Sequence, residues 1–235
     1  MEIQTKLKME DLPLKKSIGK VVVLLSGGID STTLVYYMRD RGYKVYPISF
    51  YYGQKHKKEL DFADLTCQKL NLSFKAFNIN ILRELAPSAL TRKDIEVPKG
   101  IYNEETMKIT VVPNRNMVFL ALATAYAIGL GIREVAYAAH SGDHAIYADC
   151  RPAFIEAMRK TIELCDDSKV SLSTPFTLLD KSEIIKIGFN LGVDYSLTWS
   201  CYEGKELACG KCGTCRERLE AFEKLGKIDP IKYEG

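Results

Sequence analysis

Two apolar segments near the start of the sequence are separated by the short polar run Ser26-Gly27-Gly28-Ile29-Asp30-Ser31. The segment before the run, residues 21–25, is apolar and mostly β-branched, which is typical of a strand buried on both faces of a parallel sheet. From Ile29 onward the apolar residues have helical spacing. Because glycine lets backbone N–H groups approach an anion closely, a strand, a glycine turn and a helix start predict a phosphate cradle.

The side chains of this loop are suited to a nucleotide with bound magnesium. The hydroxyls of Ser26 and Ser31 can donate to phosphate oxygens, whereas an ionised Asp30 can only accept and is suited to Mg²⁺. An aspartate can also cap the helix N-terminus, and two glycines alone can form an ordinary turn. The loop lacks the Gly-Lys-Ser/Thr ending of a Walker loop. We expect the nucleotide to contact Leu24, Leu25, Ser26, Gly27, Gly28, Ile29, Asp30, Ser31, Ser49 and Phe50.

Four of the seven cysteines, Cys201, Cys209, Cys212 and Cys215, lie close together near the end of the sequence. Four thiolates form a closed tetrahedral shell, so this spacing favours one structural zinc ion. An iron–sulfur cluster can use the same ligands, and a Cys-x-x-Cys pair can also be reactive. We expect the metal to hold the C-terminal segment, with Trp199 and Ser200, beside the nucleotide site.

Three further residues are candidates for charge neutralisation or substrate contact. Lys181 can bind phosphate, or it can be a solvated lysine at a helix start. Arg115 and Asn116 stand where a loop meets an apolar helix and can contact ATP or the substrate. The alternative for Arg115 is a salt bridge at the helix end.

The composition is that of an ordinary soluble protein, with 235 residues, 46% hydrophobic residues and a net charge of +3. This charge is too small to indicate a nucleic-acid partner. The N-terminal residues lack the apolar core of a secretory signal, and the apolar stretch 117–132 is shorter than the roughly 20 residues that span a bilayer. We therefore expect a cytoplasmic protein without a membrane or a direct nucleic-acid partner.

The remaining pattern alternates strands with helices. Strands are predicted near residues 21–25, 44–50, 73–79, 134–139 and 170–174, and helices near 31–40, 55–70, 117–132, 152–165, 181–191 and 215–225. Pro47 indicates an edge strand or a bulge, and residues 80–112 an irregular insertion. We predict an α/β fold, a doubly wound parallel sheet with ligands beyond the carboxyl ends of its strands. The expected parts are a lead-in (1–19), a nucleotide-binding domain (20–195) and a zinc-binding segment packed on it (196–235).

Several motifs together resemble one family, the 7-cyano-7-deazaguanine synthases among the PP-loop ATP pyrophosphatases. The resemblance rests on the phosphate loop, the four cysteines, Phe50-Tyr-Tyr-Gly-Gln-Lys-His56, Val112-Pro-Asn-Arg-Asn116, Asp149-Cys-Arg-Pro152 and Thr198-Trp-Ser-Cys-Tyr202. It covers nearly the whole chain from about residue 20. The segment 142–150 is shorter than the usual run of the family.

The resemblance implies a ligase of queuosine or archaeosine precursor synthesis that converts 7-carboxy-7-deazaguanine and ammonia to a nitrile with Mg-ATP. It implies catalytic roles for Asp30, Lys181 and Arg115, and a homodimer. Asp143 and Asp149 would accept from the guanine-like edge of the substrate and Arg151 would hold its carboxylate, unless these residues are caps. Two other hypotheses stay open: a tRNA sulfurtransferase that relays sulfur through Cys209 and Cys212, and a non-enzymatic nucleotide-binding module.

Overall fold

The computed structural model describes residues 18–92, 94–97, 108–143 and 147–235. Most of the expected lead-in, residues 1–19, lies outside the described residues. In the described part five parallel strands form one sheet in the order β3-β2-β1-β4-β5. The strands are β1 (Gly19–Leu24), β2 (Tyr43–Tyr51), β3 (Lys75–Asn78), β4 (Glu134–Ala136) and β5 (Ser171–Ser173). The predicted doubly wound α/β fold is confirmed.

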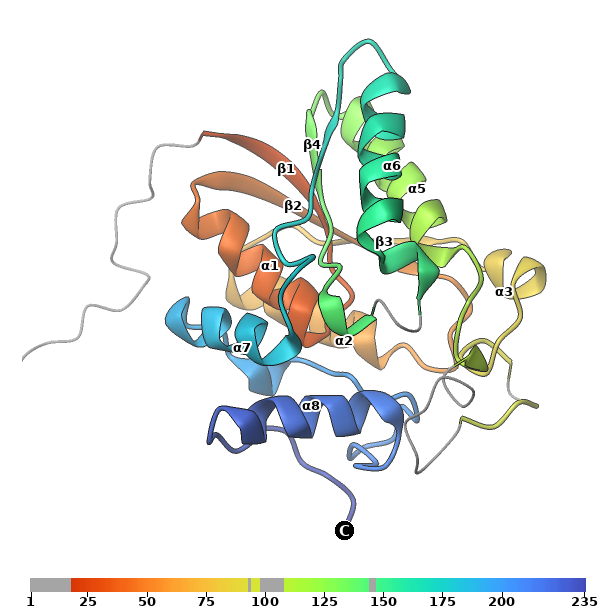
Figure 1. The fold of residues 1–235 in the computed structure, drawn as a ribbon, viewed down its shortest axis with the longest axis vertical. Coiled ribbons are helices and arrows are strands. Elements are labelled where there is room, and N and C mark those ends of the chain that lie inside the picture. The colour runs from red at the N-terminus through yellow and green to blue at the C-terminus, as the bar shows by residue number, and fades with distance from the viewer. Residues whose placement is uncertain (1–17, 93, 98–107, 144–146) are drawn as a thin grey trace, which may run out of the picture.

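Helices cover both faces of this sheet (Figure 1). One face packs against α5 (Arg115–Gly129) and α6 (Pro152–Leu164), and the other against α1 (Ile29–Asp40), α2 (Lys58–Lys69) and α7 (Lys181–Asn190). Successive side chains of a strand point to opposite faces, so Val22 of β1 packs with the first group and Val23 with the second. Both side chains are fully buried, which explains the continuous apolar run.

The C-terminal segment forms a further layer on α1 and α7. Helix α8 (Gly213–Lys224) packs against α7 through a cluster that includes Tyr195 and Phe222. The guanidinium of Arg218 is fully buried and makes two hydrogen bonds to Asp229, at 2.6 and 2.9 Å. Arg218 also donates to the hydroxyl of Thr198 at 2.8 Å. This ion pair therefore joins α8 to the chain on both sides of it.

The expectation that Pro47 marks an edge strand or a bulge is wrong. Its strand, β2, lies between β1 and β3, and Pro47 stands opposite Val23 in a regular register. The carbonyl of Ile48 accepts from Leu25 on the β1 side, so the preceding Pro47 turns its nitrogen toward β3. The described pairing with β3 begins only at Ile48, and the missing N–H of Pro47 therefore costs no ladder bond.

The apolar helix is less buried than its composition indicates. Helix α5 buries Leu120 and Ala123 against the sheet, but it exposes Met117 and Leu122. The described part of the irregular insertion, residues 80–92, 94–97 and 108–112, contains the short helix α3 (Leu82–Leu85). Within the described ranges no helix is both long and apolar enough to cross a membrane.

Candidate active site

A cavity of about 250 Å³ lies beyond the carboxyl ends of β1, β2 and β4. Its wall combines the phosphate loop, the end of β2, the first turn of α2, the first turns of α5 and α8, and the segments 137–140, 147–150 and 199–202. The sheet brings these loops together because parallel strands end at one edge. The cavity is therefore where the fold class predicts a ligand site.

The phosphate loop is held by hydrogen bonds between its two serines. The hydroxyls of Ser26 and Ser31 are 3.0 Å apart, and the backbone N–H of Ser26 donates to Ser31 at 3.1 Å. Gly28 is the N-cap residue of α1 and has no side chain to bond the first N–H groups of the helix. These N–H groups can therefore bind an anion. Asp30 lies one residue inside the helix, so it is not the N-cap.

Gly27 allows the loop to pack against α2. Its φ of +85° lies in the left-handed region, and a Cβ there would be 2.1 Å from the carbonyl oxygen of Glu59. Only glycine meets both demands. The loop and the first turn of α2 are consequently fixed in direct contact.

Asp30 and Lys181 form a network beside the loop with His140 and Glu217. The ammonium of Lys181 is 3.6 Å from a carboxylate oxygen of Asp30 and 2.5 Å from Glu217 of α8. His140 is 3.6 Å from the same oxygen of Asp30. Burial raises the pKa of Asp30, but Lys181 and His140 outweigh burial and lower that pKa below its ordinary value. Asp30 is therefore a carboxylate that stays ionised.

The donor set at Asp30 suits a hard cation. Its Oδ1 atom is buried and has no hydrogen-bond partner among the described residues. The hydroxyls of Ser26 and Ser31 lie in the same loop, and oxygen ligands of this kind together with phosphates are what Mg²⁺ prefers. An orphaned carboxylate oxygen beside a phosphate cradle thus agrees with the expected magnesium.

The other end of the cavity is aromatic and positively charged. Arg115, at the start of α5, donates to the hydroxyl of Tyr52 at 3.3 Å. The hydroxyls of Tyr147 and Tyr202 are 3.3 Å apart. Burial works against the charge of Arg115, but the neighbouring tyrosine oxygens, Tyr52 first, keep its pKa above its ordinary value. A planar anion stacked on aromatic rings would suit this end.

The expected nucleotide-contact residues other than Gly27 line the cavity: Leu24, Leu25, Ser26, Gly28, Ile29, Asp30, Ser31, Ser49 and Phe50. Ser49 donates its hydroxyl to the carbonyl of Leu25, which ties β2 to β1. The Phe50 ring packs on Phe119, with ring centroids 4.9 Å apart, and it belongs to the core of the sheet. Phe50 therefore supports the wall of the cavity more than it offers a free face.

The expected substrate residues are only partly brought together. Asn116 lines the cavity, and its amide donates to the sulfur of Cys150 at 3.3 Å. Asp149 accepts from the backbone N–H of Asn116 at 2.9 Å, so it acts as a cap for α5. Arg151 is exposed at the N-cap of α6. Asp143 ends the 3₁₀ turn Ser141–Asp143, and its side chain lies outside the described residues. Neither Asp149 nor Arg151 lines the cavity.

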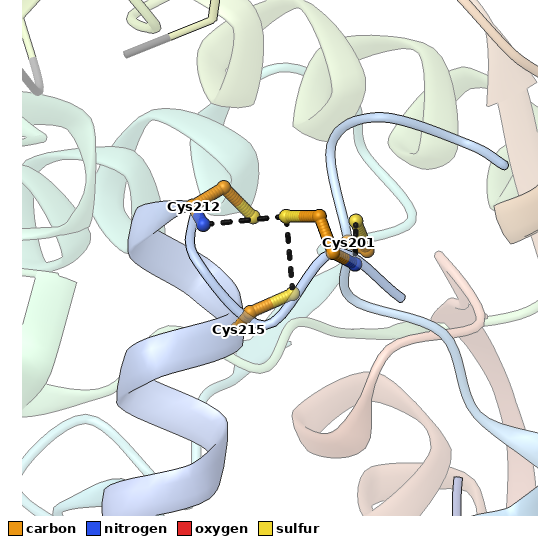
Figure 2. Close-up of side chains that lie close together, drawn as sticks. Cys201, Cys212 and Cys215 are labelled. Carbon is orange, nitrogen blue, oxygen red and sulfur yellow. Dashed lines mark hydrogen bonds between the residues drawn. The ribbon is translucent and has the colours of Figure 1, made fainter. Parts of the chain in front are cut away.

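The four clustered cysteines converge on one point. Figure 2 shows three of them, Cys201, Cys212 and Cys215, with their side chains close together. All four are buried, and their sulfur atoms lie within 4.8 Å of one another. The backbone N–H groups of Cys209 and Cys212 donate to the sulfurs of Cys201 and Cys209, both at 3.3 Å. Sulfurs around one zinc ion at about 2.3 Å would have this spacing. The arrangement agrees with the expected closed metal site.

The cysteine cluster is tied to the phosphate loop. The backbone N–H of Trp199, two residues before Cys201, donates to the carbonyl of Gly27 at 2.9 Å. Trp199 and Ser200 line the cavity, as expected. Thr214, which follows Cys212, also lines it and donates its hydroxyl to the carbonyl of Ser200 at 2.7 Å.

The sequence analysis missed two acidic residues of the cavity, Glu59 and Glu217. Each lies in the first turns of an amphipathic helix, where an acidic residue is ordinarily solvated. No local signal separates them from neighbours such as Asp61 or Glu220. Contact with Lys181 from another helix is what identifies Glu217.

Comparison with known proteins gives consistent results. The sequence model of the family described as "Queuosine biosynthesis protein QueC" matches residues 20–226. A 7-cyano-7-deazaguanine synthase of Caldicellulosiruptor saccharolyticus is 59% identical over 92% of the chain and 96% of the relative. Another, of Methanoregula boonei, is 58% identical over 92% of the chain and 99% of the relative. Among solved structures, an NMN synthetase from Francisella tularensis matches the fold with a TM-score of 0.52 and 15% identity, over 90% of the chain and 79% of the other chain.

Proposed function

The chain belongs to the QueC family and is an enzyme of queuosine precursor biosynthesis, and on this premise we propose that its cavity joins ammonia to 7-carboxy-7-deazaguanine with ATP as co-substrate. The named relatives are 7-cyano-7-deazaguanine synthases. The observation that carries the proposal is one cavity with a phosphate cradle at one end and a cationic aromatic pocket at the other.

The chemistry explains why both ends are needed. A carboxylate is a poor electrophile, so an oxygen of the substrate carboxylate first attacks the α-phosphorus of ATP. Pyrophosphate leaves and an acyl-adenylate forms. Ammonia then attacks the acyl carbon, and the bond to AMP breaks to give an amide. No protein nucleophile takes part, so catalysis depends on positioning and charge neutralisation.

The second half-reaction uses the same cavity. The amide oxygen is a poor leaving group, and a second ATP converts it to an adenylate. Loss of AMP and of the remaining N–H protons then leaves the nitrile. One loop can thus serve two adenylations in sequence, and we expect two ATP molecules to be consumed per nitrile.

Each end of the cavity has a distinct role in this proposal. The backbone N–H groups of the first turn of α1 bind phosphate oxygens, and Lys181 neutralises charge as pyrophosphate leaves. Asp30 would hold Mg²⁺, which would supply positive charge to the phosphates of the nucleotide. Arg115 binds the substrate carboxylate, in place of Arg151, which lies off the cavity. Asn116 contacts the acceptor.

We propose zinc as the metal of the four cysteines and assign it a structural role. A shell of four thiolates leaves no position for water or substrate. The link from Trp199 to Gly27 supports a role in shaping the phosphate loop. Asp143 and Asp149 remain candidates for contact with the substrate edge, although Asp149 is engaged as a cap.

Turnover with defined substrates tests the proposal. Protein incubated with 7-carboxy-7-deazaguanine, ammonium, ATP and Mg²⁺ should form the nitrile, with two AMP and two pyrophosphate molecules per product. A reaction without the carboxylate is the control. Absence of both the nitrile and AMP would refute the proposal.

The two alternative hypotheses lose support. Family membership makes the chain an enzyme, so the non-enzymatic module is wrong. The sulfurtransferase needs Cys209 and Cys212 to be accessible, yet both are buried in the four-cysteine cluster. The named relatives are synthases and not sulfurtransferases.

We further propose a homodimer, with the exposed face of α5 as a candidate interface. Met117, Leu122 and Leu130 are exposed on or beside this helix, and the exposed positions between them are alanine or glycine. Three expectations stay predictions. They are the division into residues 1–19, 20–195 and 196–235, the absence of direct nucleic-acid binding, and the cytoplasmic location. Sedimentation of the wild type and of a Leu122→Glu variant tests the dimer.

A further inference from the structure

Glu59 is a carboxylate of the cavity for which the proposed function has no role so far. It is the second residue of α2, and its side chain is only partly buried. Its backbone carbonyl is the atom that a side chain at Gly27 would strike, so the residue is fixed beside the phosphate loop. It lines the cavity together with Arg115 and Tyr52 of the acceptor side.

Three acidic side chains line the described wall of the cavity: Asp30, Glu59 and Glu217. Asp30 lies near Lys181 and His140, and Glu217 makes a 2.5 Å ion pair with Lys181. The Glu59 carboxylate makes no hydrogen bond and no ion pair with any of the described residues. Glu59 is thus the cavity carboxylate that remains available to a cation brought in from solution.

The reaction needs such a carboxylate. Ammonia is present at neutral pH mainly as ammonium, a cation that cannot attack an acyl carbon until it loses a proton. A cavity with Arg115 and Lys181 repels ammonium unless a negative group compensates. The base must also lie between the phosphate loop and the acceptor pocket, where the acyl-adenylate carbon would be.

We propose that Glu59 binds the incoming ammonium ion and removes one of its protons, so that ammonia is released next to the acyl-adenylate. This inference rests on the proposed function and adds the residue that supplies its nitrogen. The proton passes from nitrogen to the Glu59 carboxylate. The new C–N bond then forms and the bond between the acyl carbon and the AMP oxygen breaks, with its electron pair staying on AMP. The second proton goes to the phosphate group of the released AMP. Glu59 returns its proton to water.

The protonation behaviour of Glu59 suits this role. Burial raises its pKa to about 7, and Arg115 limits the rise. A carboxylate that holds a proton more firmly takes it from ammonium with a smaller free-energy cost than an ordinary glutamate. The other titratable or charged groups that line this side in the described part of the chain are Arg115 of α5, Tyr52 after β2, Lys55 and His56 before α2, and the tyrosines Tyr137, Tyr147 and Tyr202.

The test compares Glu59→Gln with the wild type in three assays. Exchange of labelled pyrophosphate into ATP, with the carboxylate substrate and without ammonium, reports adenylation alone and should change less than about 3-fold. Amide formation from ammonium should fall about 10²- to 10³-fold. Hydroxylamine is uncharged at neutral pH, so hydroxamate formation should fall less than about 5-fold.

Three further measurements separate a proton acceptor from a merely structural residue. Glu59→Asp keeps the carboxylate and should recover about a tenth or more of the ammonium-dependent rate. The ratio of wild-type to Glu59→Gln rates should stay constant below about pH 7 and fall above it, because the ionised fraction of Glu59 then stops rising while the free ammonia on which the variant depends still increases. Asp61→Asn, on an exposed position of the same helix, should leave all three assays unchanged.

Two outcomes would overturn the inference. An equal loss in all three assays would mean that Glu59 only supports the loop, and unchanged amide formation would mean that another group accepts the proton. A wild type that shows no exchange dependent on the carboxylate substrate would instead refute the proposed function. The two failures are therefore distinguishable.

Discussion

Single side chains of the cavity carry opposite charges at short range. Lys181 stands between Asp30 at 3.6 Å and Glu217 at 2.5 Å, and the two carboxylates come from different helices. Each charge compensates another, so the cavity can hold several ionised groups close together. Because Lys181, Asp30 and Glu217 are coupled, the effects of mutating them singly should not add up to the effect of mutating them together.

Asp30→Asn tests the magnesium role at the residue scale. The amide cannot balance the charge of Lys181, and it is a weaker ligand for Mg²⁺, so the adenylation rate should fall about 100-fold or more. The exchange of pyrophosphate into ATP at saturating Mg²⁺ measures this rate. Asp61→Asn serves as the control, and an unaltered rate in the Asp30 variant would contradict the assignment.

The raised pKa of Glu59 predicts a pH-dependent stability. Between its ordinary value of 4.5 and about 7, Glu59 is protonated in the folded protein and ionised in the unfolded chain. The folded state then binds more protons, so this residue makes the protein less stable as pH rises through that window. Glu59→Gln removes the effect.

Urea unfolding at pH 5 and pH 8 checks this expectation. The free energy of unfolding of the wild type, relative to Glu59→Gln, should drop by about 2 kcal/mol between the two values. Asp61→Asn shows how the rest of the molecule responds to pH. A constant difference between the wild type and Glu59→Gln would mean that the pKa of Glu59 is not raised.

At the scale of elements, the buried pair of Arg218 and Asp229 fastens α8 to the rest of the chain. Two hydrogen bonds join the pair, and Tyr233 donates its hydroxyl to the same carboxylate at 2.5 Å. Asp229→Asn leaves a buried guanidinium without its counter-charge and should cost about 3–5 kcal/mol. Urea unfolding at fixed pH measures the loss.

An exposed ion pair gives the matched control for that experiment. Lys205 and Glu234 are 3.2 Å apart, with side chains 53% and 35% exposed, so Glu234→Gln should change stability by less than about 1 kcal/mol. If both variants lost equally little, the buried pair would not be what holds α8 in place.

The elements themselves were largely readable from sequence, because each depends on local spacing. The phosphate loop and the four cysteines are short motifs whose chemistry is complete within a few residues. Glu217 was not readable, since its contact with Lys181 depends on how α8 packs on α7. The cap made by Asp149 and the tolerance of Pro47 likewise depend on partners that only the assembled fold supplies.

At the scale of the whole molecule, the cysteine cluster joins the C-terminal segment to the cavity. Chelation under reducing conditions should remove one metal ion per chain, lower the melting temperature by more than about 10 °C and abolish adenylation. Metal analysis and thermal unfolding measure the two effects. Cys201→Ser should reproduce them, while Cys165→Ser, at an exposed position outside the cluster, should not.

The hydrogen bond from Trp199 to Gly27 also bears on how the protein is made. The ribosome releases the phosphate loop early, but the wall that completes the cavity, residues 199–217, emerges some 170 residues later. At about 5–20 residues per second, a nascent chain exposes an unfinished nucleotide site for many seconds. A stalled chain that ends before Trp199 would contain the phosphate loop but not the wall formed by residues 199–217. We therefore expect activity only from chains whose translation has passed this wall.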